Sequence, residues 1–146
     1  MTKIFSTLGL ALFLSGVAWS QPSSSGGSVA KYLDVTIAQS ASLSSAANLG
    51  ACTPVGISVA IQAVAGWTAA DLTLQASIDG TNYYNVWDEF GAEVTIKVPT
   101  AANSAPVRIR LNPADFWGVT SLKLRSGTST SAVTQTAART LRIVCR

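Results

Sequence analysis

Two cysteines and a few carboxylates are the residues of this 146-residue chain whose types could do chemistry. The chain has no histidine. This removes the commonest general base, the commonest metal ligand and the usual partner of a serine or cysteine nucleophile. A structural zinc site needs four ligands, which two cysteines do not supply. The sequence therefore predicts a protein that is not an enzyme and carries no cofactor.

Cys52 and Cys145 are expected to pair if the chain is exported, because disulfides form in oxidising compartments. The bridge would close a loop of about 94 residues and contribute roughly 4.5 kcal/mol in the chain-entropy model. It would tie the last strand to the start of the second predicted strand. Two buried free thiols are the alternative that the sequence leaves open.

The carboxylates do not form a catalytic pair. Asp88 and Glu89 are adjacent, and adjacent residues of a strand point to opposite faces, whereas glycosidases need two carboxyl groups facing each other. A loop calcium site built from Asp79, Asp88 or Glu89 is conceivable, because calcium takes oxygen ligands. Exposed turn residues are the simpler interpretation.

Aromatic residues are the candidates for an interaction surface. Aromatic faces suit both sugar stacking and protein contacts, although some of these residues must form core. Tyr83 and Tyr84 are adjacent and cannot both face inward from a regular strand, so one of them is expected to be exposed. The candidates are Trp67, Tyr83, Tyr84, Trp87, Phe116 and Trp117.

Charge is scarce along the chain. Charged residues make up 12% of it and the net charge is +3, against about 25% charged residues in typical soluble domains. A neutral polar surface of this kind favours an extracellular or particle-bound β protein over a cytosolic enzyme. The basic residues are interpreted as same-face strand pairs on a solvated sheet surface, and without interleaved aromatics they do not predict nucleic-acid binding. They are Arg108, Arg110, Lys123, Arg125, Arg139 and Arg142.

The first 20 residues resemble a secretory signal peptide. Lys3 precedes an apolar run, and Ala18 and Ser20 supply the small residues before a predicted cut. Two alternatives stay open for residues 4–19, namely a short membrane or shell anchor and a buried N-terminal helix. Residues 21–30 are rich in serine and glycine and predict a flexible linker. The folded domain is expected to span residues 31–146.

Short alternating segments separated by turn signals fill that domain. One face of 55–62 is expected to carry Val55, Ile57, Val59 and Ile61, and one face of 72–78 to carry Leu72, Leu74, Ala76 and Ile78. Further strands are predicted at 32–39, 83–87, 93–98, 107–111, 119–125 and 140–145, with turns at 79–82 and 88–91 and a single helical turn at 112–117 that begins with Pro113. The pattern predicts an all-β protein, a single β-sandwich of jelly-roll type behind an N-terminal apolar helical segment.

Three motifs occur in a recognisable order. The stretch from Trp67 to Gly80 reads WTAADLTLQASIDG, and it is followed by NPADF at 112–116 and LKLRSGT at 122–128. This order resembles small virion proteins encoded near the head genes of tailed phages and prophages, over about residues 55–144. Asn112 stands where that family usually has aspartate, and the signal-like N terminus is not part of the pattern.

The resemblance implies a β-sandwich that decorates a phage capsid or forms part of a head spike or fibre. Its partners would be the major capsid protein or another virion protein, and a homo-oligomer, for which the family suggests a trimer, is expected. The alternative function is a secreted carbohydrate- or surface-binding module, which would carry Trp67, Tyr84 or Trp117 in an exposed row. The expected location is the virion, or the extracellular medium for the alternative.

Overall fold

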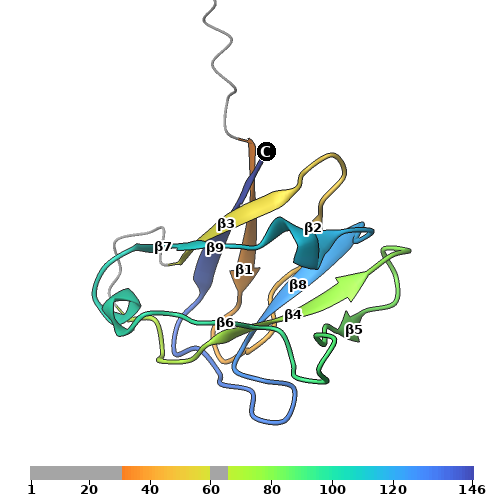
Figure 1. The fold of residues 1–146 in the computed structure, drawn as a ribbon. Coiled ribbons are helices and arrows are strands. Elements are labelled where there is room, and N and C mark those ends of the chain that lie inside the picture. The colour runs from red at the N-terminus through yellow and green to blue at the C-terminus, as the bar shows by residue number, and fades with distance from the viewer. Residues whose placement is uncertain (1–30, 60–65) are drawn as a thin grey trace, which may run out of the picture.

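The structure, a computed structural model, describes residues 31–59 and 66–146, and these form two antiparallel β-sheets (Figure 1). The predicted all-β architecture is therefore confirmed. The signal-like segment, the linker and Ile61 lie outside the described residues. Within the described part of the chain, no helix is long and apolar enough to cross a membrane.

The first sheet has the strand order β1-β9-β3-β7. It consists of β1 (Lys31–Ile37), β3 (Pro54–Val59), β7 (Val107–Arg110) and β9 (Arg139–Cys145). The alternation of burial along β9 shows why these segments are strands, because Leu141 and Ile143 are fully buried while Thr140, Arg142 and Val144 are half-buried. β1 and β7 are the edge strands of this sheet.

The second sheet has the order β2-β8-β4-β5, with β6 also paired to β4. It consists of β2 (Ala47–Asn48), β4 (Leu72–Ser77), β5 (Tyr84–Asn85), β6 (Thr95–Ile96) and β8 (Ser121–Ser126). Two short 3-10 turns, η1 (Thr100–Asn103) and η2 (Pro113–Phe116), lie on the connections before and after β7. In η2 the Asn112 side chain accepts a hydrogen bond from the Ala114 amide, as the predicted capped turn requires.

The core lies between the two sheets. Val35, Ile57, Leu141 and Ile143 come from the first sheet, and Leu72, Leu74, Leu122 and Leu124 from the second. Each contributes about 1.5–3 kcal/mol by leaving water.

Two predicted faces need correction. Ile78 does not continue the buried face of β4, because the strand ends at Ser77 and the side chain enters the turn, where it is exposed. Val55 is only half-buried, because the register of β3 against β9 shifts between Pro54 and Gly56.

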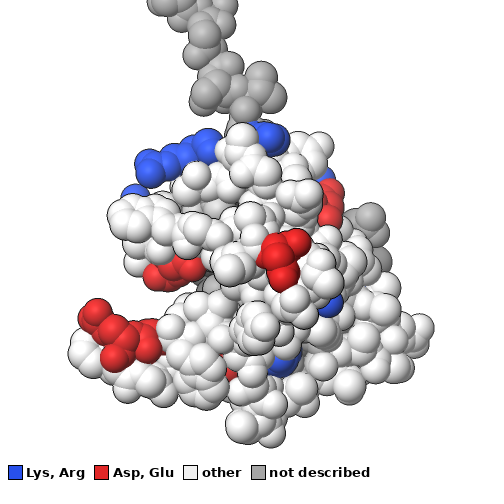
Figure 2. Space-filling view, turned by 90° about the vertical axis from the view of Figure 1, so that its right-hand side faces the viewer, with Lys and Arg blue, Asp and Glu red and all other residues white. Residues whose placement is uncertain are grey.

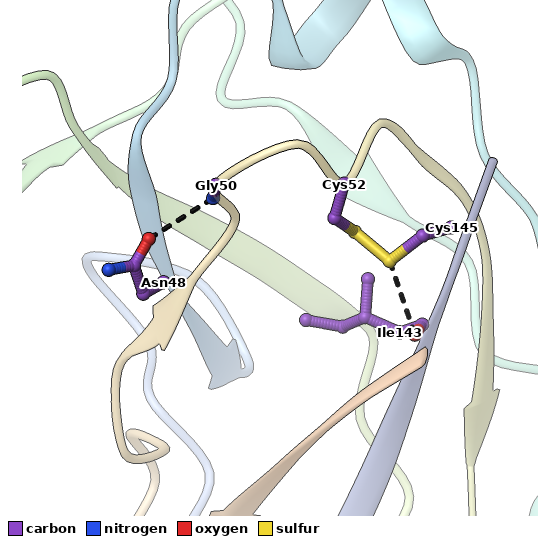
Figure 3. Close-up of a disulfide and its surroundings, with 5 residues drawn as sticks. All are labelled: Asn48, Gly50, Cys52, Ile143 and Cys145. Atoms are coloured by element: carbon purple, nitrogen blue, oxygen red, sulfur yellow. Dashed lines mark hydrogen bonds between the residues drawn. A yellow bond between two sulfur atoms is a disulfide. The ribbon is translucent and has the colours of Figure 1, made fainter. Parts of the chain in front are cut away.

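Cys52 and Cys145 form a disulfide, shown in Figure 3. Cys145 ends β9, and Cys52 lies on the segment that leads into β3. Their Cα atoms are 5.1 Å apart, an ordinary separation for a disulfide. Asn48 and Gly50, also drawn in Figure 3, form a turn in which the Asn48 side chain accepts from the Gly50 amide at 3.1 Å. The bridge fastens the end of the chain to the loop that crosses between the sheets.

Candidate interaction site

An exposed hairpin, which includes β5 and ends before β6, projects beside the second sheet. We call residues 84–93 the aromatic hairpin, because its large side chains Tyr84, Trp87 and Phe90 are 69%, 54% and 86% exposed. Tyr84 pairs with Ala76 of β4, whereas Trp87 pairs with Glu93 across the hairpin. The two residues are three apart, so in extended backbone their side chains leave opposite faces, and Phe90 lies in the connecting turn. The hairpin therefore presents aromatic surface on both faces and at its tip.

The turn at the tip is held by Asp88. Its Oδ1 atom accepts hydrogen bonds from the Phe90 amide at 2.9 Å and the Ala92 amide at 2.8 Å. Gly91 has φ +80°, a conformation that glycine adopts without strain. Phe90 is thus fixed in an exposed position by its own turn.

A buried ion pair anchors the base of the hairpin to the sheet. Arg125 Nη1 donates to Glu93 Oε1 at 3.1 Å, and both side chains are nearly buried, with 11% and 9% exposed. Arg125 Nη2 also donates to Asn85 Oδ1 at 2.8 Å. The amide and hydroxyl of Ser129 donate to Glu93 Oε2 at 2.9 and 3.0 Å. Strand β8 and the 127–131 loop therefore hold both arms of the hairpin.

Tyr83, which precedes the hairpin, has a structural role. Its hydroxyl oxygen lies 2.8 Å from Ser121 Oγ, and Lys123 Nζ lies 4.0 Å from the centre of its ring. Tyr83 is half-buried while Tyr84 is exposed. Of the two adjacent tyrosines, Tyr83 therefore packs against the sheet and Tyr84 is exposed.

The other predicted aromatics do not join the hairpin. Trp67 is 2% exposed, and its Nε1 donates to the Ala70 carbonyl at 2.9 Å, so it belongs to the core. Phe116 is also buried, whereas Trp117 is 80% exposed after η2. With Trp67 buried, the exposed row proposed for sugar binding is incomplete.

Phe90 is the exposed hairpin residue that the sequence interpretation missed. Its place in the predicted turn at 88–91 was the available signal, because a large apolar side chain at the tip of a tight turn has no core to enter. Tyr32 and Ile78 are further exposed apolar residues outside the predicted set.

The carboxylates serve as turn and ion-pair acceptors. Asp79 Oδ1 accepts from the amides of Asn82 and Thr81, both at 2.8 Å, and these bonds hold the pKa of Asp79 well below its usual range. The Asp71 carboxylate is hydrogen-bonded by Lys97, and the Asp34 carboxylate by Arg142. Among the described residues, no three histidine, cysteine or acidic side chains gather into a metal-ligating group, and the calcium hypothesis for Asp79, Asp88 and Glu89 gains no support there.

The surrounding surface is sparsely charged. Figure 2 shows one face of the molecule on which neutral residues dominate and charged side chains form small separate groups. A polar groove of about 460 Å³ lies elsewhere on the second sheet and includes Asn48, Asp79, Tyr83 and Ser121 in its lining.

Comparison with known proteins gives no identification. No protein-family model, no curated protein and no solved structure matches the chain.

Proposed function

We propose that this protein is a non-catalytic virion component that decorates a phage capsid or forms part of a head spike or fibre, and that the aromatic hairpin is its docking element. The observation that carries the proposal is the exposure of Tyr84, Trp87 and Phe90 on the two faces and the tip of a braced hairpin. A hairpin with aromatic side chains on both faces and at its tip could insert between neighbouring subunits of an assembly. Aromatic anchors in pockets commonly dominate the energy of protein interfaces.

The finer fold assignment that goes with this proposal is a jelly roll. The strand pairs are nested, since β1 pairs with β9, β2 with β8, β3 with β7, and β4 with β5 and β6. If β5 and β6, which both pair with β4, are counted as one interrupted strand, the described residues form eight strands. Nested antiparallel pairs of this kind are the connectivity of a jelly roll, in which a long antiparallel hairpin folds over into two sheets. Jelly rolls serve in viral capsid and lectin domains, so the fold is compatible with the virion proposal and its alternative.

A low-charge protein of this kind would gain its attachment from repeated copies. Binding of linked copies to a repetitive surface raises overall affinity without new contacts. The proposal therefore includes a homo-oligomer, for which a trimer is the working assignment, and a capsid protein as partner. The N-terminal segment would serve as an export signal or as a shell-inserting anchor.

The experiment that tests the docking element uses purified particles from a strain lacking this gene. The protein and its Tyr84→Ser/Trp87→Ser/Phe90→Ser variant are added, and co-sedimenting protein is quantified. The variant should bind at least about tenfold less, as expected when interface anchors are removed. Ile78→Ser, which changes an equally exposed residue outside the hairpin, is the control and should bind normally. Equal binding by all three proteins would overturn the docking assignment.

The secreted carbohydrate-binding module is the second candidate. The groove beside Tyr83 favours it, because amide, carboxylate and hydroxyl groups there could bind sugar hydroxyls. Retention on immobilised polysaccharides tests this function. Loss of retention in Trp117→Ala with an intact fold would support the module over the virion protein.

A further inference from the structure

Two exposed arginines, Arg108 and Arg110, lie on edge strand β7. Most of the acidic side chains are already engaged, including Asp34 with Arg142, Asp71 with Lys97 and Glu93 with Arg125. Within residues 31–59 and 66–146, neither Arg108 nor Arg110 has an acidic partner within ion-pair distance, and both are exposed. These two side chains are two residues apart and share the outer face of the first sheet.

A groove runs beside these arginines. Arg108, Arg110 and Val55 line a hollow of about 420 Å³. Gly56 is the register partner of Arg110, and a Cβ atom there would lie 3.6 Å from Arg108 Nε and 3.1 Å from the Ile109 carbonyl oxygen. The missing side chain at Gly56 therefore lets the Arg108 side chain lie close over the β3 backbone.

The backbone N–H and C=O groups at the outer edge of β7 also belong to Arg108 and Arg110. The Leu111 amide donates to the Val55 carbonyl at 3.1 Å, so residues 111 and 55 form a hydrogen-bonded pair of the antiparallel ladder. Hydrogen-bonded pairs alternate with non-hydrogen-bonded pairs along an antiparallel strand. The backbone N–H and C=O groups of Ile109 therefore point toward β3, and those of Arg108 and Arg110 point away from it. No described strand pairs with this outer edge of β7. Backbone and side-chain donors are therefore available at the same two positions.

We propose that edge strand β7 binds an extended, carboxylate-bearing segment of a partner protein by strand addition. The backbone of the segment would pair with Arg108 and Arg110, and acidic side chains at alternate positions would contact the two guanidinium groups. A second copy of β7 is a poor occupant, because antiparallel pairing would bring like charges together. Residues 1–30 and 60–65 contain no aspartate or glutamate, so the acidic segment must come from elsewhere.

The test uses the full chain at low ionic strength and a capped peptide of alternating threonine and glutamate, which places its carboxylates on one face. We expect binding that weakens with salt, and no binding of the matched threonine–glutamine peptide. Arg108→Gln/Arg110→Gln should bind at least about tenfold more weakly, since two charge-assisted contacts are lost. Lys31→Gln/Arg146→Gln is the control, because it removes the same charge from two other exposed residues, and it should bind normally.

Two further measurements separate strand addition from general attraction to anions. Peptide binding should slow hydrogen exchange at the Arg108 and Arg110 amides, and N-methylation of alternate peptide residues should abolish that effect and weaken binding. Equal loss of binding in the two double variants, equal binding of the N-methylated peptide, or tighter binding of a single-stranded oligonucleotide would each overturn the proposal.

Discussion

Glu93 is the residue on which the geometry of the aromatic hairpin most depends. Its carboxylate joins Arg125 of β8 to Ser129 of the following loop, and it is almost completely buried. Glu93→Ala would leave the Arg125 guanidinium buried without its ion-pair partner. We expect the free energy of unfolding to fall by about 3 kcal/mol, as is common when one member of a buried pair is removed.

Urea unfolding measures this loss. Glu93→Leu/Arg125→Met is the matched variant, because it removes both charges and should recover much of the stability. A Glu93→Ala protein as stable as the wild type would show that the ion pair does not brace the hairpin.

Gly127 is fixed by its surroundings as well as by its backbone. Its φ is +86°, and a Cβ atom there would lie 2.3 Å from the Ser131 carbonyl oxygen and 2.8 Å from the Val133 nitrogen. Gly127→Ala should therefore lower the free energy of unfolding by about 3 kcal/mol, because backbone must move to admit the methyl group. At Gly91, with φ +80° and no atom within 4 Å of the added Cβ, the same change should cost only about 1 kcal/mol. Thermal and urea unfolding compare the two, and equal losses would contradict the role of the close contacts.

At the scale of elements, alternation of apolar residues predicted most strands. The segments predicted at 32–39, 107–111 and 140–145 correspond to β1, β7 and β9, because each has one face in the core. The predicted strand at 93–98 shortens to Thr95–Ile96, since the residues before it are drawn into the hairpin base.

The candidate site was only partly predictable. Tyr84 and Trp87 were among the predicted aromatics, but composition could not separate them from Trp67, which belongs to the core cluster. The Arg125–Glu93 pair joins residues 32 apart through the pairing of β4 with β8 and β6. The predicted same-face pair Arg139 and Arg142 was wrong, because a separation of three residues places them on opposite faces of β9, with Arg139 buried and Arg142 bound to Asp34.

The disulfide joins the end of β9 to the segment that leads into β3. It joins residues 93 apart, and the chain-entropy model assigns such a loop about 4.5 kcal/mol of stabilisation. We expect Cys52→Ala/Cys145→Ala to lose about 4 kcal/mol in urea unfolding, and the wild type to lose a similar amount under strong reductant. Peptide mapping without reduction provides the direct check of the bond, and free thiols in the oxidised protein would contradict it.

The free energy of unfolding of the whole protein should be nearly constant around neutral pH and should fall in acid. The pKa values of Asp34, Asp71 and Asp79 are lowered by hydrogen bonds from Arg142, from Lys97 and from the Asn82 amide respectively. A carboxyl whose folded pKa is lowered contributes its full stabilisation above its unfolded pKa of about 4, and loses it as the pH falls further. The chain has no histidine to titrate between pH 5 and 8.

The urea midpoint should therefore stay level from pH 5 to 8 and decline below about pH 4. The urea midpoint of the Asp79→Asn variant should decline less steeply in acid, because asparagine keeps a carbonyl acceptor for the turn but has no charge to lose. A midpoint that is unchanged at pH 2 would contradict the assignment of these carboxylates.

The proposed function requires the whole protein to be bound to virus particles. The resemblance of its motif order to small virion proteins, its low charge and its braced aromatic hairpin all favour a particle-bound protein. Mass spectrometry of gradient-purified particles from the source culture tests this most directly. The proposal predicts recovery of the protein with the particles in amounts proportional to the capsid protein. Its absence from the particles, together with a soluble form in the medium that begins at Gln21, would contradict the virion assignment and favour the secreted binding module.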